Sequence, residues 1–341
     1  MNVGLEWITN SVLLFVGDTF LTLMGVLLNG VMIMTLNMSS LVNSIGVVDS
    51  TWSIIRDIAS ILIIFFLLYT SIEIIIGVDN SKVQHIIVMV VVAGVLINFS
   101  LFFTKVLVDT SNLVSLAFYR AIAPSGANYD FSAQAGSASY LSNAFTSGGL
   151  SNEIMTGLGV TSIYQMASST YNTSTSGTNP LLIIGSGVGG FIIMMMVGLS
   201  FLAAAILFSV RIGLLIILMA FSPFYFIGFI IPNIKSKISD KWRDLLLAQC
   251  MIMPVYMLFM YVALRVITAP AFKSFVHPTG GASTGVAGVS VGVIGLIVQY
   301  IIGMIFISIP LIAAMEYASF GKDFANMATN KVKSWGKSAV G

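Results

Sequence analysis

Charged residues are scarce in this chain of 341 residues: Asp, Glu, Lys and Arg together make up 8% of it. Soluble domains carry about 25% charged residues, so this chain could not cover a surface exposed to water. Hydrophobic residues make up 57%, and the mean hydropathy is +1.00. The composition excludes an ordinary soluble domain and predicts a polytopic membrane protein.

Cysteine and histidine are almost missing. Cys250 is the single cysteine, so no intrachain disulfide can form. The two histidines, His85 and His277, are far apart, and the sequence has no HExxH, GxSxG, CxxC or Walker motif. We therefore expect no enzyme, and no catalytic, cofactor-binding or metal-binding residue. The formal net charge of +2 is too small to indicate nucleic-acid binding by the chain as a whole.

Long apolar runs dominate the chain. A hydrocarbon core of about 30 Å needs roughly twenty apolar residues in a helix. Seven stretches meet this: about 11–36, 53–77, 85–107, 181–209, 211–232, 245–267 and 286–315. The split at Arg211 could be replaced by another turn within 181–232. The first stretch contains Asp18 and lacks a basic leader, so we interpret it as a retained span. We predict an all-α transmembrane bundle of about seven spans (six to eight).

Residues 108–180 have a different composition, rich in Ser, Thr, Asn, Gly and Ala. We predict a flexible polar loop with short helices, such as 108–120 and 150–167. It would separate a three-span region, 1–107, from a four-span region, 181–315. A basic tail, 316–341, follows.

Basic residues near the ends of spans predict the orientation of the chain. Lysines and arginines gather in the turn 233–243 and in the tail, and we expect both in the cytoplasm. The N-terminus then lies outside, whereas the loop 108–180 lies inside, at odds with its composition. An eighth or re-entrant segment at 108–123 would resolve this. We expect a multi-pass protein of the cytoplasmic (inner) membrane with a cytoplasmic C-terminus.

The run "RIGLLIILMAFSPFYFIGFIIP" begins with an arginine and contains a Ser-Pro pair. Arg211, read as a span end, could extend to the headgroups; alternatively it lines a polar path through the bundle. Pro223 has no N–H and frees the carbonyl of Met219, so we expect a kink near Ser222.

A short amphipathic helix is predicted after Pro232, because Ile234, Ile238 and Trp242 recur every four residues. Its other faces carry Lys235, Lys237, Lys241 and Arg243. These cations would attract anionic membrane lipid or dock a cytoplasmic partner.

Further polar residues lie within the predicted spans and are candidates for intramembrane contacts, since buried charges are costly there. Besides Arg211 they are Asp18, Arg56, Asp57, Glu73, Asn98 and Lys105. Arg56 and Asp57 point about 100° apart on a helix and need not pair with each other. Lys105 and Asp109 have the i,i+4 spacing of a helix-surface pair.

Small residues form a stripe in "GVAGVSVGVIG". Its 3-4-3 spacing puts four glycines on one helix face, where another helix could approach closely: Gly285, Gly288, Gly292 and Gly295.

Three stretches occur in the order "WSIIRDIASILIIFFLLY", "VMVVVAGVLINFSLFFTKVLVDTSN" and "FLAAAILFSVRIGLLIILMAFSPFYFIGFIIP…KW". In these the chain resembles the TrbL-like inner-membrane subunits of bacterial type IV secretion and conjugation systems, over roughly 50–110 and 181–265. The resemblance implies a non-catalytic subunit that helps transfer DNA or protein across the cytoplasmic membrane. It also implies separate ATPases and other membrane subunits, or further copies, in one assembly. A self-contained transporter or channel for a small solute, and a membrane scaffold, remain alternatives.

Overall fold

The computed structural model describes residues 2–77, 83–123, 149–158, 180–230, 239–270 and 301–316. These residues are helical and include no strand, which confirms the all-α class. The helices are α1 (Asn2–Leu36), α2 (Met38–Ile45), α3 (Val47–Ile75), α4 (Val83–Ile122), α6 (Leu150–Leu158), α8 (Pro180–Ala220), α9 (Pro223–Ile230) and α11 (Asp240–Thr268). A further apolar helix covers Ile301–Glu316.

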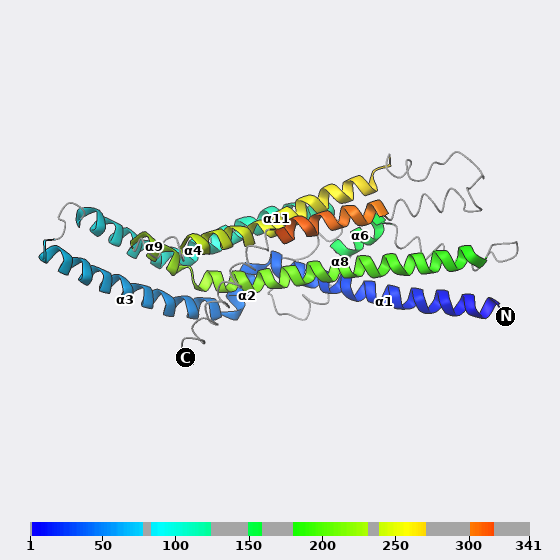
Figure 1. Ribbon diagram of the computed structural model, residues 1–341, viewed down its shortest axis with the longest axis horizontal. Helices are drawn as coiled ribbons and strands as arrows, with labels where there is room; N and C mark the ends of the chain where they lie inside the picture. The colour runs from blue at the N-terminus through cyan, green and yellow to red at the C-terminus, as the bar shows by residue number, and fades with distance from the viewer. Residues whose placement is uncertain are drawn as a thin grey trace, which may run out of the picture.

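The helices form an elongated array (Figure 1). α1 and α3 follow each other along its length, with α2 between them, whereas α4 runs back along α3 toward α6. α8 packs along α1, and α11 packs along α4. Helices from both predicted membrane regions are therefore packed together, and the division of the chain into those regions stays a prediction.

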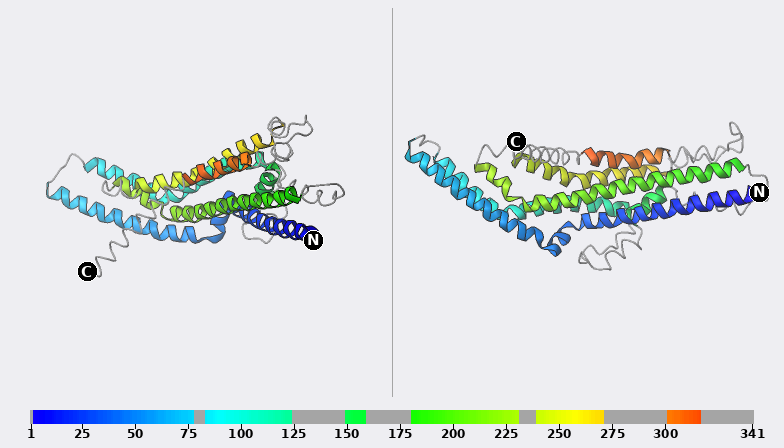
Figure 2. Two further views of the ribbon diagram at one scale, coloured as in Figure 1. Left: turned by 45° about the vertical axis from the view of Figure 1, so that its right-hand side comes forward. Right: turned by 60° about the horizontal axis from the view of Figure 1, so that its bottom comes forward.

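α2 forms the bend between α1 and α3. It buries Met38 and Val42 and ends at Gly46, whose φ of 65° is left-handed. Glycine adopts that conformation without steric cost and is common after a helix end. The Gly46 N–H donates to the Val42 carbonyl, and α3 starts at the next residue. α3 consequently leaves at an angle to α1 (Figure 2).

Within the described ranges, five helices are long and apolar enough to cross a membrane: Phe15–Leu36, Val47–Ile75, Ile86–Ile122, Met194–Ala220 and Asp240–Thr268. The chain is thus a multi-pass membrane protein. The whole of α4 or α8 is about 60 Å long, whereas a hydrocarbon core is about 30 Å thick. The array is longer than one bilayer core, so parts of these helices extend beyond it or cross it at a tilt.

Two predicted boundaries are wrong. α8 continues through Arg211 to Ala220, so 181–209 and 211–232 are not separate spans. α4 continues to Ile122, so 108–120 is neither a loop helix nor a re-entrant segment. In both places polar residues that resemble a span end in sequence face the interior, where they bond to one another. Of the predicted helix 150–167, the structure describes Leu150–Leu158, and the rest lies outside the described residues.

The Ser-Pro pair separates α8 from α9. α8 ends at Ala220, and Pro223 is the first residue of α9, a position where its missing N–H costs nothing. The carbonyl of Met219, which loses its helical donor at Pro223, accepts from the Ser222 N–H at 3.3 Å. α9 packs against α4, and it shares an apolar core with α3 and α4 that includes Ala59, Ile97 and Ile227.

Candidate functional site: a buried polar junction

α4, α8 and α11 meet at a polar cluster, hereafter the junction, made of Arg211, Asn112 and Gln249. Arg211 is completely buried, and the two amides are 5% and 1% exposed. The Arg211 Nε donates to the Gln249 backbone carbonyl, and its Nη2 donates to the Asn112 Oδ1, both at 2.9 Å. One guanidinium group therefore ties the three helices together.

Helical periodicity puts Arg211 on the buried face of α8. Phe201, Ala204, Phe208 and Leu215 are buried and follow the 3-4 spacing of which Arg211 is a member. Phe208 belongs to an apolar cluster with α1 and α11, and Leu215 to one with α2 and α4. The junction thus lies between two apolar cores.

Pro254 in α11 explains why one backbone carbonyl next to the junction is available to another helix. A proline inside a helix leaves the carbonyl four residues earlier without its helical donor, and here that residue is Cys250. The Ser111 hydroxyl of α4 donates to this carbonyl. The neighbouring carbonyl of Gln249 accepts from Arg211. The proline therefore frees one acceptor, which α4 uses, next to the carbonyl that binds Arg211 of α8.

Three nitrogen atoms of the junction remain without a hydrogen-bond partner: Arg211 Nη1, Asn112 Nδ2 and Gln249 Nε2. All three are donors. The interpretation of Arg211 as a span-end residue reaching the headgroups is wrong, because its side chain lies inside α8 and has no exposed surface.

A second polar region lies in the arm, which we define as α3, residues 83–103 of α4, and α9. Trp52 Nε1 of α3 donates to Ser100 Oγ of α4 at 2.9 Å. The same Ser100 oxygen lies 3.1 Å from Ser222 Oγ, which donates to it from the turn before α9. Ser100 therefore links the three helices of the arm.

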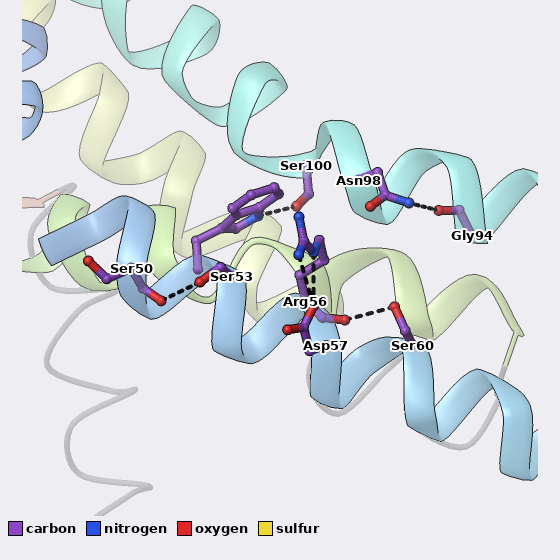
Figure 3. Close-up of polar contacts among 9 residues, drawn as sticks. Ser50, Ser53, Arg56, Asp57, Ser60, Gly94, Asn98 and Ser100 are labelled. Atoms are coloured by element: carbon purple, nitrogen blue, oxygen red, sulfur yellow. Dashed lines mark hydrogen bonds and ion pairs between the residues drawn. The ribbon is translucent and has the colours of Figure 1, made fainter. Parts of the chain in front are cut away.

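Arg56 and Asp57, for which the sequence left pairing open, pair with each other (Figure 3). Arg56 Nη2 lies 2.9 Å from Asp57 Oδ1, and its guanidinium carbon lies 5.0 Å from the Trp52 ring centroid. The Asp57 side chain is 66% exposed. Asp57 lies on the same face of α3 as Ser50, Ser53 and Ser60. The three serine hydroxyls each donate to a backbone carbonyl three or four residues earlier in the chain.

Lys105 does not pair with Asp109, so that predicted pair is wrong. Its Nζ lies 3.1 Å from Asp49 Oδ1 of α3 and 3.3 Å from Asn43 Oδ1. Asp109 instead accepts a hydrogen bond from the Ser39 hydroxyl of α2. Lys105 therefore holds α4 to both α2 and α3, and Asp109 holds it to α2.

The described part of the basic turn belongs to α11. Lys241, Trp242 and Arg243 lie in its first turn rather than in a separate interfacial helix. Trp242 Nε1 donates to the Leu218 carbonyl at 3.1 Å, and its ring lies 5.2 Å from that of Tyr225. Arg243 pairs with Asp240 and Asp244. Trp242 thus fastens the start of α11 to the end of α8.

The remaining predicted residues do not join these clusters. Asn98 is exposed and donates to the Gly94 carbonyl of its own helix, and Glu73 is exposed near the end of α3. Asp18 lies in α1, but its side chain is outside the described residues. Six further predicted residues lie wholly outside the described ranges: Lys235, Lys237, Gly285, Gly288, Gly292 and Gly295.

Sequence reasoning missed Asn112, Gln249 and the pair Asn29–Ser151. Asn29 Nδ2 donates to Ser151 Oγ at 2.8 Å, and the Ser151 N–H donates to Asn29 Oδ1, which holds the start of α6 on α1. The signal for the junction was Asn112 one turn from buried Val108 and Ser115, on the inward face of α4.

Within the described ranges, no three His, Cys, Asp or Glu residues are grouped to hold a metal ion. No family model, curated protein or solved structure matches this chain. The arrangement can join helices through neutral acceptors and one buried cation.

Proposed function

We propose that this chain is a non-catalytic membrane subunit of a bacterial type IV secretion or conjugation system. It would help transfer DNA or protein across the cytoplasmic membrane, together with other membrane subunits and ATPases. The resemblance over 50–110 and 181–265 is the starting point. In support, Trp52, Arg211 and Trp242 from those segments each make a hydrogen bond between helices.

The main structural support for the proposal is a stripe of polar residues on one face of α3. Ser50, Ser53, Asp57 and Ser60 have 3-4-3 spacing and share one face. The opposite face buries Ile55, Ala59 and Ile63 against the rest of the chain. A membrane-length helix that faced lipid would be apolar on its outer face, because polar groups are costly there. The stripe therefore favours contact with another protein of an assembly.

A transfer assay tests this proposal. Donor cells that lack the gene should lose transfer, and the wild-type gene should restore it. Ser60→Phe should lower transfer by about tenfold, which corresponds to about 1.4 kcal/mol lost from a subunit contact. Ile58→Phe is the matched control, because Ile58 is an exposed apolar residue beside the stripe. Normal transfer without the gene, or from cells with Ser60→Phe at wild-type membrane levels, would contradict the proposal.

The buried arginine favours a second candidate, a self-contained transporter or channel, since ionisable residues inside membranes often mark solute pathways. Flux into liposomes that contain only this chain would support it and argue against a subunit role.

A further inference from the structure

The positive charge of Arg211 is buried without a negative partner among the described ion pairs. Its two hydrogen-bond acceptors, the Gln249 carbonyl and the Asn112 amide oxygen, are neutral. A guanidinium group does not lose its proton in proteins. An uncompensated buried ion costs several kcal/mol. The junction therefore needs a negative charge.

The unpartnered groups of the junction specify what kind of group supplies that charge. Arg211 Nη1, Asn112 Nδ2 and Gln249 Nε2 come from three helices, and each can only donate. A cation would be repelled by the guanidinium. A water molecule could accept hydrogen bonds but would leave the charge uncompensated. An anion meets both requirements.

We propose that Arg211, Asn112 and Gln249 form a binding site for a small monovalent anion of the halide class, with chloride as the ligand. Small size follows from the surroundings: buried Phe208 and Leu215 lie about one turn from Arg211 along α8, and buried Met253 lies about one turn from Gln249 along α11. The guanidinium provides the charge, and the two amides provide further donors. This inference is independent of the proposed secretion role.

Chloride binding can be measured on the purified full-length chain in detergent. We expect its unfolding temperature to rise, and then saturate, as chloride replaces gluconate at constant ionic strength, because a ligand of the folded state stabilises it. The ³⁵Cl resonance should broaden when the protein is added, and bromide should reverse the broadening. These measurements need no variant.

Gln249→Met isolates the amide donor. Arg211 bonds the backbone carbonyl of Gln249, so the variant keeps that bond and loses only the side-chain donor. Loss of one hydrogen bond to an anion should raise the apparent Kd for chloride about tenfold. Asn98→Leu is the control, because that exposed amide bonds its own helix and should leave the Kd unchanged.

Equal unfolding temperatures in chloride and gluconate, without ³⁵Cl broadening, would overturn the proposal. A wild-type chloride response in Gln249→Met would also overturn the site, since the amide would then take no part. If Gln249→Met does not fold, Arg211→Lys replaces it: it keeps the charge, loses the planar donor set and should weaken the response.

Discussion

The junction and the arm each contain an arginine inside a membrane-length helix, and the two arginines have opposite surroundings. Arg211 has no exposed surface and bonds neutral groups on two other helices. Arg56 keeps 33% of its side chain exposed and pairs with the adjacent Asp57. Apolar side chains follow the same division: Ile75 of the arm is 83% exposed, whereas Phe208 beside the junction is buried. Both side chains carry a positive charge, so the charge alone does not determine their role. The buried guanidinium joins helices, whereas the partly exposed one pairs within its own helix.

The largest difference between the regions should appear when each arginine is replaced by methionine. Arg211→Met removes two buried hydrogen bonds of a charged donor and should lower the free energy of unfolding by about 3 kcal/mol. Arg56→Met removes a partly exposed pair and should cost less than about 1 kcal/mol. Denaturant unfolding in detergent micelles measures both. Equal losses would remove the distinction between the regions.

Two glycines differ in how closely other helices pack on them. A Cβ at Gly198 would lie 2.6 Å from a Phe20 ring carbon, whereas at Gly94 of the arm nothing lies within 4 Å. Gly198→Ala should therefore destabilise the chain by about 1–3 kcal/mol through overpacking of α1 against α8. Gly94→Ala should stabilise it by up to about 1 kcal/mol through helix propensity. Thermal unfolding of the two variants should shift in opposite directions; shifts of the same sign would argue against the described packing.

Trp52→Phe tests the hydrogen bond that links the arm. It keeps an aromatic ring but removes the indole N–H that donates to Ser100. We expect a loss of about 1 kcal/mol in unfolding free energy. Ser100→Ala in the same background should add less than it does alone, because the two residues share that bond. Fully additive losses would show that the bond contributes nothing.

The smallest effect is expected at the ion pair between Lys105 and Asp49, whose carboxylate side chain is 52% exposed. Asp49→Asn should lower the free energy of unfolding by about 0.5 kcal/mol or less, and added salt should remove the difference. A loss as large as that of Arg211→Met would contradict the exposure of the pair.

The helical class and the approximate positions of the long helices follow from apolar runs, because a backbone in lipid must satisfy its own hydrogen bonds. The errors at 107 and 211 have one cause. Arg211 and the polar composition that begins at 108 indicate span ends in the sequence. In the structure Asp109, Asn112 and Arg211 have partners on other helices, which hold them inside. A sequence does not show a partner many residues away, such as Gln249 for Arg211.

The candidate site was only partly predictable. The sequence predicts Arg211 as an intramembrane polar contact. Its helical spacing from the large apolar residues at 201, 208 and 215 also indicates that it lies on the buried face of α8. Gln249 is a lone amide in an apolar run, and the one signal for Asn112 is its helical spacing from Val108 and Ser115. Pro254 is a further signal in the sequence, because a proline inside α11 predicts a free carbonyl at Cys250, to which Ser111 donates.

Gly46 acts as the pivot of a lever. α3 has 29 residues and is therefore about 44 Å long. A change of only about 10° in the angle at Gly46 would swing the tip of α3 near Ile75 through about 8 Å, a distance larger than one helical turn. A side chain at position 46 that resists the left-handed conformation would therefore redirect α3 together with the helices packed on it.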